Sequence, residues 1–155
     1  MEIVHIWTDG SCLRDGRGGW GAVLWQPSVE RYQEIYGSAK STTNNRMELQ
    51  AAINALELLK DSCEVLLTSD SEYVIKNMKR HYPFRWKAQG WRISSGATTV
   101  NIDLWEQMII QHYKHKIEYL WVKGHAGNPT NEIADRLATE AARYQLKMGS
   151  KGDKM

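Results

Sequence analysis

The sequence predicts one α/β domain built on a single five-stranded mixed sheet that is flanked by helices. The first observation is a series of three apolar runs near the start of the chain, which is typical of an antiparallel meander. The second is that two later short apolar runs alternate with helical patterns, which favours parallel strands joined by crossovers. The third is size, because 155 residues with 42% hydrophobic residues suit one domain with a substantial core.

The antiparallel part of the predicted sheet comes first in the chain. Residues 2–9 form the first strand, which ends at Asp9 and leads into a glycine-rich turn. Two further strands are predicted over 20–26 and 31–39, on either side of Pro27. Asp9 therefore stands at a strand end, where sheets of this class form their ligand sites.

A helix is predicted over residues 46–60, after Thr and Asn residues that make good N-caps. Its polar side chains repeat at helical spacing on one stripe: Gln50, Asn54 and Glu57. At about 100° per residue, Glu48 points to nearly the opposite, inward side. A buried, unpaired carboxylate is costly, so Glu48 either meets a cation or stays protonated. The alternative is a capping box, in which Glu48 reaches back to the amide of Asn45.

The fourth predicted strand, residues 63–70, ends in Asp70 and is followed by a short helix over 71–79. The next segment, residues 79–98, is aromatic and basic, and we call it the arm. Pro83 and Gly90 interrupt it, so it is predicted to be a helical turn with an exposed loop.

The arm carries an unusual concentration of positive charge, although the whole chain has a net charge of only +2. No acid occurs from Tyr73 to Ile102, and this stretch holds six cations: Lys76, Lys79, Arg80, Arg85, Lys87 and Arg92. Aromatic residues alternate with them: Tyr82, Phe84, Trp86 and Trp91. Such a pattern suits a polyanion, because cations bind phosphates and rings stack on sugars and bases. The alternative is that the rings pack on one another to hold the arm together.

The last part of the chain supplies a helix over 101–114, a fifth strand over 116–122 and a helix over about 131–146. Asp135 lies at the edge of the apolar face of this last helix. The domain is predicted to span residues 1–146, with a flexible polar tail over 147–155.

Composition narrows the class of protein. Cys12 and Cys63 lack metal-type spacing and no signal peptide precedes them, so free thiols in the cytoplasm are expected. No apolar run is long enough for a membrane span. Nothing indicates an oligomer or an obligate protein partner, so a monomer is expected.

Four acids stand where the predicted elements could converge: Asp9, Glu48, Asp70 and Asp135. Mg²⁺ prefers oxygen ligands, and clustered like charges favour a dication. Two such ions about 3.5–4 Å apart can clamp a phosphodiester. The alternative for each Asp is a structural one, because an Asp at a strand end often caps a turn or a helix.

His125 lies between Gly124 and Gly127 in a predicted loop. The glycines give the backbone freedom, and a His with a pKa near neutrality can carry protons. The alternative is a loop His that only binds a carbonyl.

Several motifs occur in the order seen in one known family: TDGSC (8–12), TTNNRMEL (42–49), TSDSEYV (68–74), KAQGW (87–91), NIDLW (101–105) and WVKGHAGNPTNEIADRLA (121–138). With these motifs the chain resembles the type 1 ribonucleases H of the bacterial form. The resemblance implies a ribonuclease H-like fold and a Mg²⁺-dependent endonuclease, with Mn²⁺ as a possible substitute, that cuts the RNA strand of RNA–DNA hybrids and leaves 5′-phosphate and 3′-hydroxyl ends.

The resemblance also implies roles for individual residues. The metal ligands would be Asp9, Glu48, Asp70 and Asp135, and His125 would assist product release or proton transfer. The cleft contacts with substrate would come from Ser11, Cys12, Thr43, Asn44, Arg46 and Glu72. The arm, with Trp86, Lys87 and Trp91, would hold the DNA strand.

The chain departs from the family pattern at two places. The loop after Cys12 is one residue shorter than usual and contains Asp15, and Glu72 replaces the usual Gln. Both changes add negative charge near the expected RNA contacts, so they bear on hybrid affinity and cut-site choice.

Two other functions are considered. A nuclease or resolvase that cuts all-DNA duplexes is the second hypothesis, and it predicts cleavage of a DNA duplex. A duplex-binding module without catalysis is the third, and it predicts that at least one of the four acids is missing. All four are present.

Overall fold

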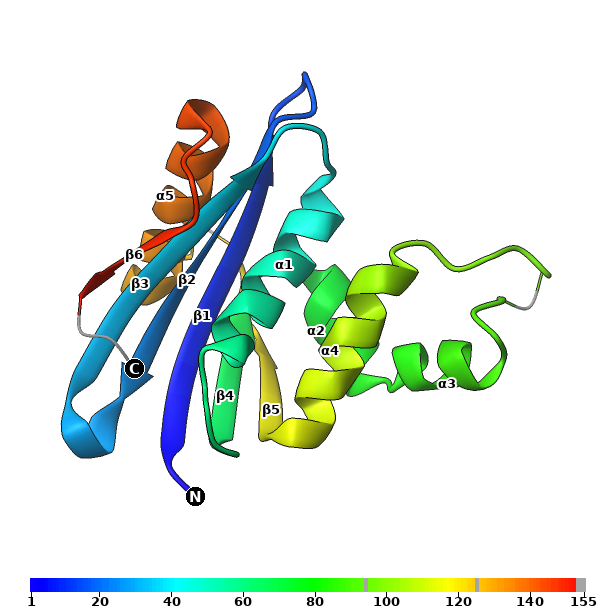
Figure 1. Cartoon of the computed structure of the whole chain (residues 1–155), viewed down its shortest axis with the longest axis horizontal. Coiled ribbons are helices and arrows are strands. Elements are labelled where there is room, and N and C mark those ends of the chain that lie inside the picture. The colour runs from blue at the N-terminus through cyan, green and yellow to red at the C-terminus, as the bar shows by residue number, and fades with distance from the viewer. Residues whose placement is uncertain (94, 125, 153–155) are drawn as a thin grey trace.

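The computed structural model describes residues 1–93, 95–124 and 126–152. Six strands form one sheet in the order β5-β4-β1-β2-β3-β6 (Figure 1). The strands are β1 (Ile3–Cys12), β2 (Gly18–Gln26), β3 (Arg31–Ala39), β4 (Glu64–Ser69), β5 (Lys116–Trp121) and β6 (Gly149–Gly152). The helices are α1 (Asn44–Glu57), α2 (Glu72–Lys79), α3 (Tyr82–Ala88), α4 (Ile102–Lys114) and α5 (Pro129–Tyr144), with a short 3₁₀ turn at Pro27–Val29.

The mixed sheet is as predicted in its first five strands. β1, β2 and β3 pair in antiparallel fashion, and β4 and β5 continue the sheet parallel to β1. The prediction of five strands is wrong, because β6 pairs antiparallel with β3. β6 lies inside the segment that we expected to be a flexible tail. Its sequence GSKG has neither alternation nor β-branched residues, so only backbone pairing with the edge of β3 makes it a strand.

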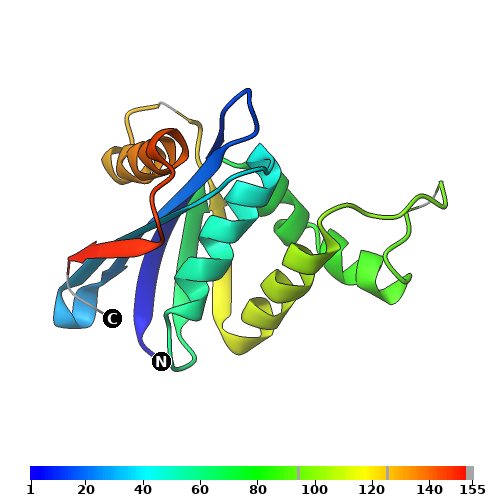
Figure 2. The same cartoon turned by 45° about the horizontal axis from the view of Figure 1, so that its top comes forward.

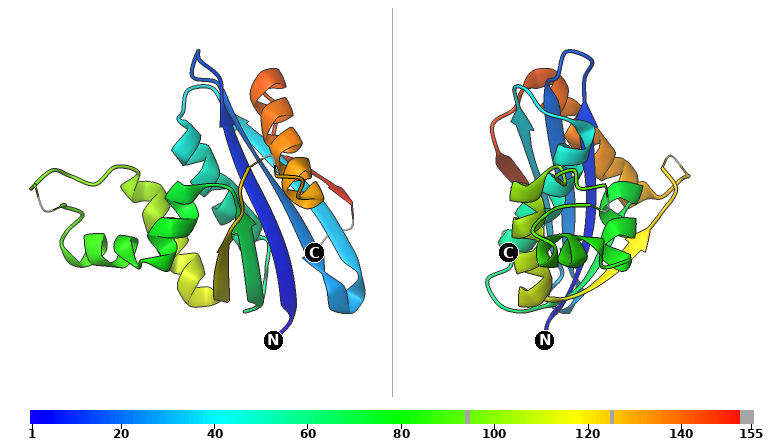
Figure 3. Two further views of the ribbon diagram at one scale, coloured as in Figure 1. Left: turned by 180° about the vertical axis from the view of Figure 1, so that it is seen from behind. Right: turned by 90° about the vertical axis from the view of Figure 1, so that its right-hand side faces the viewer.

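Helices cover both faces of the sheet (Figure 2). On one face, α1, α2 and α4 bury the main apolar core, which includes Ile6, Leu49, Ile53, Leu67 and Trp105. On the other face α5 lies across β2 and its neighbours, where Val23 packs against Ala134 and Leu137. Figure 3 shows α5 from behind, apart from the other helices.

The arm projects from the α2 and α4 side of the molecule (Figure 3). Its helical turn is a seven-residue helix, α3, in which Pro83 is the buried residue. Trp86 contacts Trp105 of α4 with ring centroids 5.8 Å apart. The aromatic side chains therefore attach the arm to the domain. Within the arm, the rings of Tyr82 and Trp86 have centroids 6.2 Å apart, as the packing alternative predicted.

Some element boundaries differ from the predictions. β1 does not end at Asp9 but continues to Cys12 because Gly10, Ser11 and Cys12 still pair with β2. α1 begins earlier than predicted, since Thr43 is its N-cap and accepts a hydrogen bond from the Arg46 amide. Among the described residues, no helix combines the length and the apolar character needed to cross a membrane.

Candidate carboxylate site

Two of the four acids are brought together by strand register. In the parallel pair of β1 and β4 the last registered partners are Thr8 and Ser69. Asp9 is the next residue of β1 and Asp70 directly follows β4, so the two residues lie side by side where β4 ends. Carboxylate oxygens of Asp9, Glu48 and Asp70 all lie within 4.8 Å of one another. The sequence prediction that these acids converge is confirmed by this geometry.

Glu48 reaches the cluster from the buried side of α1, as its helical phase predicted. The Glu48 side chain is only 4% exposed, and its Oε1 accepts a hydrogen bond from the Gly10 amide at 3.0 Å. The same amide donates to Oδ1 of Asp9 at 2.8 Å. A capping box is excluded, because the N-cap is Thr43 and Glu48 lies five residues beyond it.

Gly10 makes this arrangement possible because it has no side chain. A Cβ atom at this position would lie 2.4 Å from the backbone nitrogen of Glu48 and 2.6 Å from the carbonyl carbon of Met47. Both are backbone atoms of α1, so neither could move away without displacing the helix. The start of α1 therefore packs directly on β1, which places Glu48 beside Asp9.

Asp135 is brought to the site by a second close approach. Gly21 is the β2 partner of Asp9, and a Cβ there would lie 2.6 Å from the Leu137 Cβ. α5 therefore packs against the strand next to Asp9, and Asp135, which is half-buried, lines the same cleft as the other acids.

The cluster strongly disfavours negative charge when no cation is present. Burial, followed by the charge of Asp70, raises the pKa of Asp9 to about 8. Burial and the charge of Asp9 raise the pKa of Glu48 well above its ordinary value. The Gly10 amide lowers the Glu48 pKa only in part. These acids therefore tend to hold protons until a cation replaces them.

The residues present fit a divalent metal ion. All the candidate ligands are carboxylate oxygens, which suit a hard cation such as Mg²⁺. The second Glu48 oxygen, Oε2, is buried and has no hydrogen-bond partner. A buried oxygen of this kind is costly unless something binds it, and a cation would do so. The cleft has a volume of about 390 Å³.

Several predicted substrate residues lie around this cleft. Asn44 and Glu72 line it, and Thr43 caps the helix that begins beside it. Ser11 and Cys12 are half-buried on the part of β1 that continues past Asp9. Asn45 and Tyr73 also line the cleft but were not predicted. Asn45 adjoins a predicted residue, whereas nothing in the sequence pattern distinguishes Tyr73.

Arg46 is held by α4 and does not lie free at the surface. Its guanidinium donates to both carboxylate oxygens of Asp103, at 3.0 and 2.7 Å. It also donates to Oδ1 of Asn101 at 3.2 Å. Three hydrogen bonds thus orient Arg46 close to the start of α1.

The predicted arm residues lie apart from the carboxylates. Trp86 and Trp91 are partly buried against the core, whereas Lys87 is exposed. The structure does not bring these three residues to the acidic cleft. His125 lies outside the described residues.

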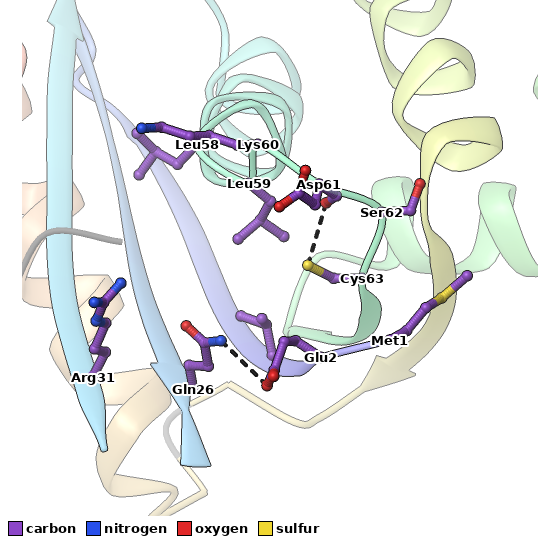
Figure 4. Close-up of a pocket in the computed structure, with 11 residues that line it drawn as sticks. Met1, Glu2, Gln26, Arg31, Leu58, Leu59, Lys60, Asp61, Ser62 and Cys63 are labelled. Carbon is purple, nitrogen blue, oxygen red and sulfur yellow. Dashed lines mark hydrogen bonds between the residues drawn. The ribbon is translucent and has the colours of Figure 1, made fainter. Parts of the chain in front are cut away.

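A larger cavity, about 670 Å³, lies at the opposite end of the sheet (Figure 4). Its wall includes Glu2 and Val4 at the beginning of β1, far along the strand from Asp9. Polar groups in it bind one another, since Gln26 donates to Glu2 at 3.3 Å and the Cys63 thiol donates to the Asp61 carbonyl at 3.3 Å. None of the four acids lines this cavity, so the candidate site is the smaller carboxylate cleft.

The comparisons with known proteins agree with this geometry. The sequence pattern of the RNase H family matches residues 1–143. The chain is 47% identical over 143 residues to the ribonuclease H of Novosphingobium aromaticivorans, covering 92% of this chain and 98% of the relative. It is 49% identical over 138 residues to the ribonuclease HI of Pseudomonas aeruginosa, covering 88% of this chain and 91% of the relative.

A solved structure agrees with the fold as well. The crystal structure of LC9-RNase H1, described as a type 1 RNase H with the type 2 active-site motif, superimposes with a TM-score of 0.85 at 31% identity. The match covers 97% of this chain and 78% of that one. The chain therefore belongs to the RNase H family, whose members hydrolyse the RNA strand of RNA–DNA hybrids.

Proposed function

We propose that this chain is a Mg²⁺-dependent endonuclease that cuts the RNA of RNA–DNA hybrids with two ions held by Asp9, Glu48, Asp70 and Asp135. The observation that carries the proposal is the buried carboxylate cluster, in which an orphaned Glu48 oxygen and a raised Asp9 pKa both favour a bound cation. Mn²⁺ has the same preference for oxygen ligands and is proposed as a substitute.

When bound, the metal ions supply the positive charge that activates the attacking water and stabilises the leaving 3′ oxygen in an in-line displacement. The chain's own residues hold that charge in place. Asp9 lies within β1, Asp70 directly follows β4, and Glu48 comes from a helix packed directly on β1. His125 is proposed to carry protons during turnover. The products would carry 5′-phosphate and 3′-hydroxyl ends.

Recognition of the hybrid is proposed to divide between two surfaces. The residues of the cleft that would meet the RNA strand are Ser11, Cys12, Thr43, Asn44, Arg46 and Glu72. The 2′-hydroxyl distinguishes RNA from DNA, and a hybrid exposes it on one strand only. The arm, with Trp86, Lys87 and Trp91, would hold the DNA strand through its exposed cations and ring edges. Selection would thus depend on shape and sugar, not on base sequence.

One cleavage assay tests this function. A single end-labelled sequence is presented as RNA–DNA hybrid, RNA duplex and DNA duplex, with Mg²⁺ and with a chelator. We expect internal cuts in the RNA of the hybrid alone, and no cuts with the chelator. Cleavage of the DNA duplex would favour a resolvase-like nuclease, and hybrid binding without cleavage would favour a binding module.

Two further proposals concern the state of the protein. We propose that the chain acts as a monomer and that it works in the cytoplasm. The two cysteines are free in the structure, which is compatible with a reducing compartment. Light scattering on the purified protein tests the monomer directly, since a mass of twice 17.8 kDa would contradict it.

A further inference from the structure

We infer that Trp121 is a positioning residue for Asp70, an inference that rests on the proposed role of Asp70 as a metal ligand. Trp121 is the last residue of β5, and its indole Nε1 donates a hydrogen bond to the backbone carbonyl of Asp70 at 3.0 Å. The ring is 37% exposed, so burial in the core does not account for its position.

Asp70 lies between two regular elements of the fold, where Trp121 contacts its backbone. β4 ends at Ser69, and α2 begins after its N-cap, Ser71. Strand pairing of β4 with β5 ends with Ser69 opposite Trp121, and the Val122 amide still donates to the Ser69 carbonyl at 3.0 Å. The Asp70 carbonyl and the Ser71 amide belong to one planar peptide group. The Ser71 amide donates to the Ser69 hydroxyl at 3.0 Å, and the Trp121 indole donates to the carbonyl on the other side of the same peptide. Together the two hydrogen bonds fix this peptide, and the direction of the Asp70 carboxylate follows from the backbone.

One residue of α2, Lys76, lies over the Trp121 ring, and a second, Glu72, binds Lys76. The Lys76 ammonium lies 5.4 Å from the ring centroid, within the range of a cation–π contact. The same ammonium lies 3.0 Å from a Glu72 carboxylate oxygen, one helical turn away. Glu72 lines the carboxylate cleft, so this chain of contacts joins the rim of the cleft to the residue that orients Asp70.

The segment that follows β5 also contacts Asp70 directly. A Cβ at Gly124 would lie 2.7 Å from Oδ2 of Asp70, so the absence of a side chain leaves room for this carboxylate. Residues 121–124 thus fix the backbone of Asp70 through Trp121 and leave its side chain clear at Gly124. Trp121 acts on the metal through Asp70 and does not touch the metal itself.

The test is a calorimetric titration of the metal-free protein with Mg²⁺, without substrate. Trp121→Phe removes the N–H donor and keeps an aromatic face for Lys76. We expect Mg²⁺ affinity to fall roughly 10-fold, the low end of what removal of a ligand-orienting partner costs. The matched control is Trp25→Phe at the far end of β2, which should leave Mg²⁺ affinity unchanged. Thermal melts in chelator report any general loss of stability separately.

The outcomes separate this inference from the proposed function. Wild-type protein that binds Mg²⁺ no better than Asp70→Asn would overturn the proposed metal site. Wild-type binding that is lost in Asp70→Asn but unchanged in Trp121→Phe would overturn the inference alone, even if the melting temperature falls. If Trp121→Phe does not fold, Trp121→Tyr, which keeps a larger aromatic side chain but also lacks the indole N–H, decides the question. It should weaken Mg²⁺ binding to a similar extent, and unchanged binding would overturn the inference.

Discussion

The carboxylate cleft and the arm are built in opposite ways. The cleft gathers like charges from β1, α1, β4 and α5, and the backbone packing around it is so close that glycine is required at two positions. The arm spreads like charges of the other sign over α3 and a loop, and most of its side chains are exposed. In the cleft, the packed core holds the acids together against their mutual repulsion. In the arm, water screens the repulsion between the exposed cations.

This difference indicates how a polyanion could be bound and cut by one small domain. Chemistry on a phosphodiester needs ligands fixed to a fraction of an ångström, so its acids lie on packed strand and helix ends. Grip on a phosphate backbone needs only charge within reach, so its cations can lie on a short helix attached by aromatic contacts. We therefore expect mutations in the cleft to affect the chemical step and mutations in the arm to affect binding.

The largest expected effect is that of Asp70→Asn in the cleft. It keeps the shape of the side chain but removes a charged ligand, and metal charge stabilisation is worth several kcal/mol. We expect kcat for hybrid cleavage to fall by at least about 10³-fold, while circular dichroism stays that of a folded protein. The exposed Asp61 supplies the matched control, Asp61→Asn, which should cleave like the wild type. Residual cleavage near the wild-type rate would show that Asp70 is not a ligand.

The next largest effect is expected when a glycine of the cleft is replaced, and a glycine of the arm provides the comparison. Gly10→Ala forces α1 away from β1 and so moves Glu48, and a misplacement of about 1 Å can cost roughly 10²-fold in rate. Gly90→Ala lies in the arm, where nothing comes within 4 Å, and meets only the strain of a positive φ of 70°. We expect kcat to fall for the first variant and to stay unchanged for the second. Steady-state kinetics with saturating hybrid and Mg²⁺ measures both, and equal kcat values would contradict the comparison.

A smaller effect is expected when charge is removed from the arm. Arg85 and Lys87 are exposed on α3, and Arg85 lies 5.5 Å from the Tyr82 ring. Replacing both by Ala should raise KM about 10-fold near 0.1 M salt and leave kcat unchanged. The slope of log KM against log salt should become shallower by about 0.9 for each phosphate that the arm no longer neutralises.

The control for the arm is a pair of exposed lysines elsewhere, Lys147 and Lys151, changed together to Ala. It removes the same formal charge near the C-terminal end, so it should leave KM and its salt dependence unchanged. An equal rise in KM for both pairs would mean that net charge, not the arm, governs binding.

Much of the site could be predicted from the sequence because its acids follow from simple periodicities. Asp9 and Asp70 follow apolar strand runs, and Glu48 breaks the polar stripe of its helix at a position that must face inward. Cap chemistry indicated that Thr or Asn residues precede α1, and Thr43 is the N-cap, although the helix begins earlier than predicted. In each case a local rule and the fold agree.

The features that sequence patterns could not predict depend on contacts between distant backbones. β6 is a strand only because the edge of β3 is available to it. The need for glycine at positions 10 and 21 appears only once α1 and α5 are packed on the sheet. Tyr73 joins the cleft through tertiary contacts, since its hydroxyl accepts hydrogen bonds from Asn101 and Trp105 at 3.0 Å each. The predicted roles of the substrate residues and of His125 remain predictions.

The smallest expected effect concerns the repulsion stored in the metal-free cleft. The pKa of Asp9 rises from 3.8 to about 8 in the folded protein, so the folded state binds protons more tightly than the unfolded state does. The contribution of Asp9 to the free energy of unfolding is therefore fully present below about pH 4, and it is lost as the pH rises towards 8. Asp9→Asn does not titrate, so in chelator it should be more stable than the wild type at pH 8 and equally stable at pH 3.5.

Denaturant unfolding at several pH values measures this difference, with Asp61→Asn as the exposed control. Saturating Mg²⁺ should restore the wild type relative to Asp9→Asn, because a ligand that binds only the folded state stabilises it. A difference between the two proteins that does not change from pH 3.5 to pH 8 would mean that Asp9 is not the group under strain. The charges of the cleft would then be solvated by water like those of the arm, in spite of the buried geometry.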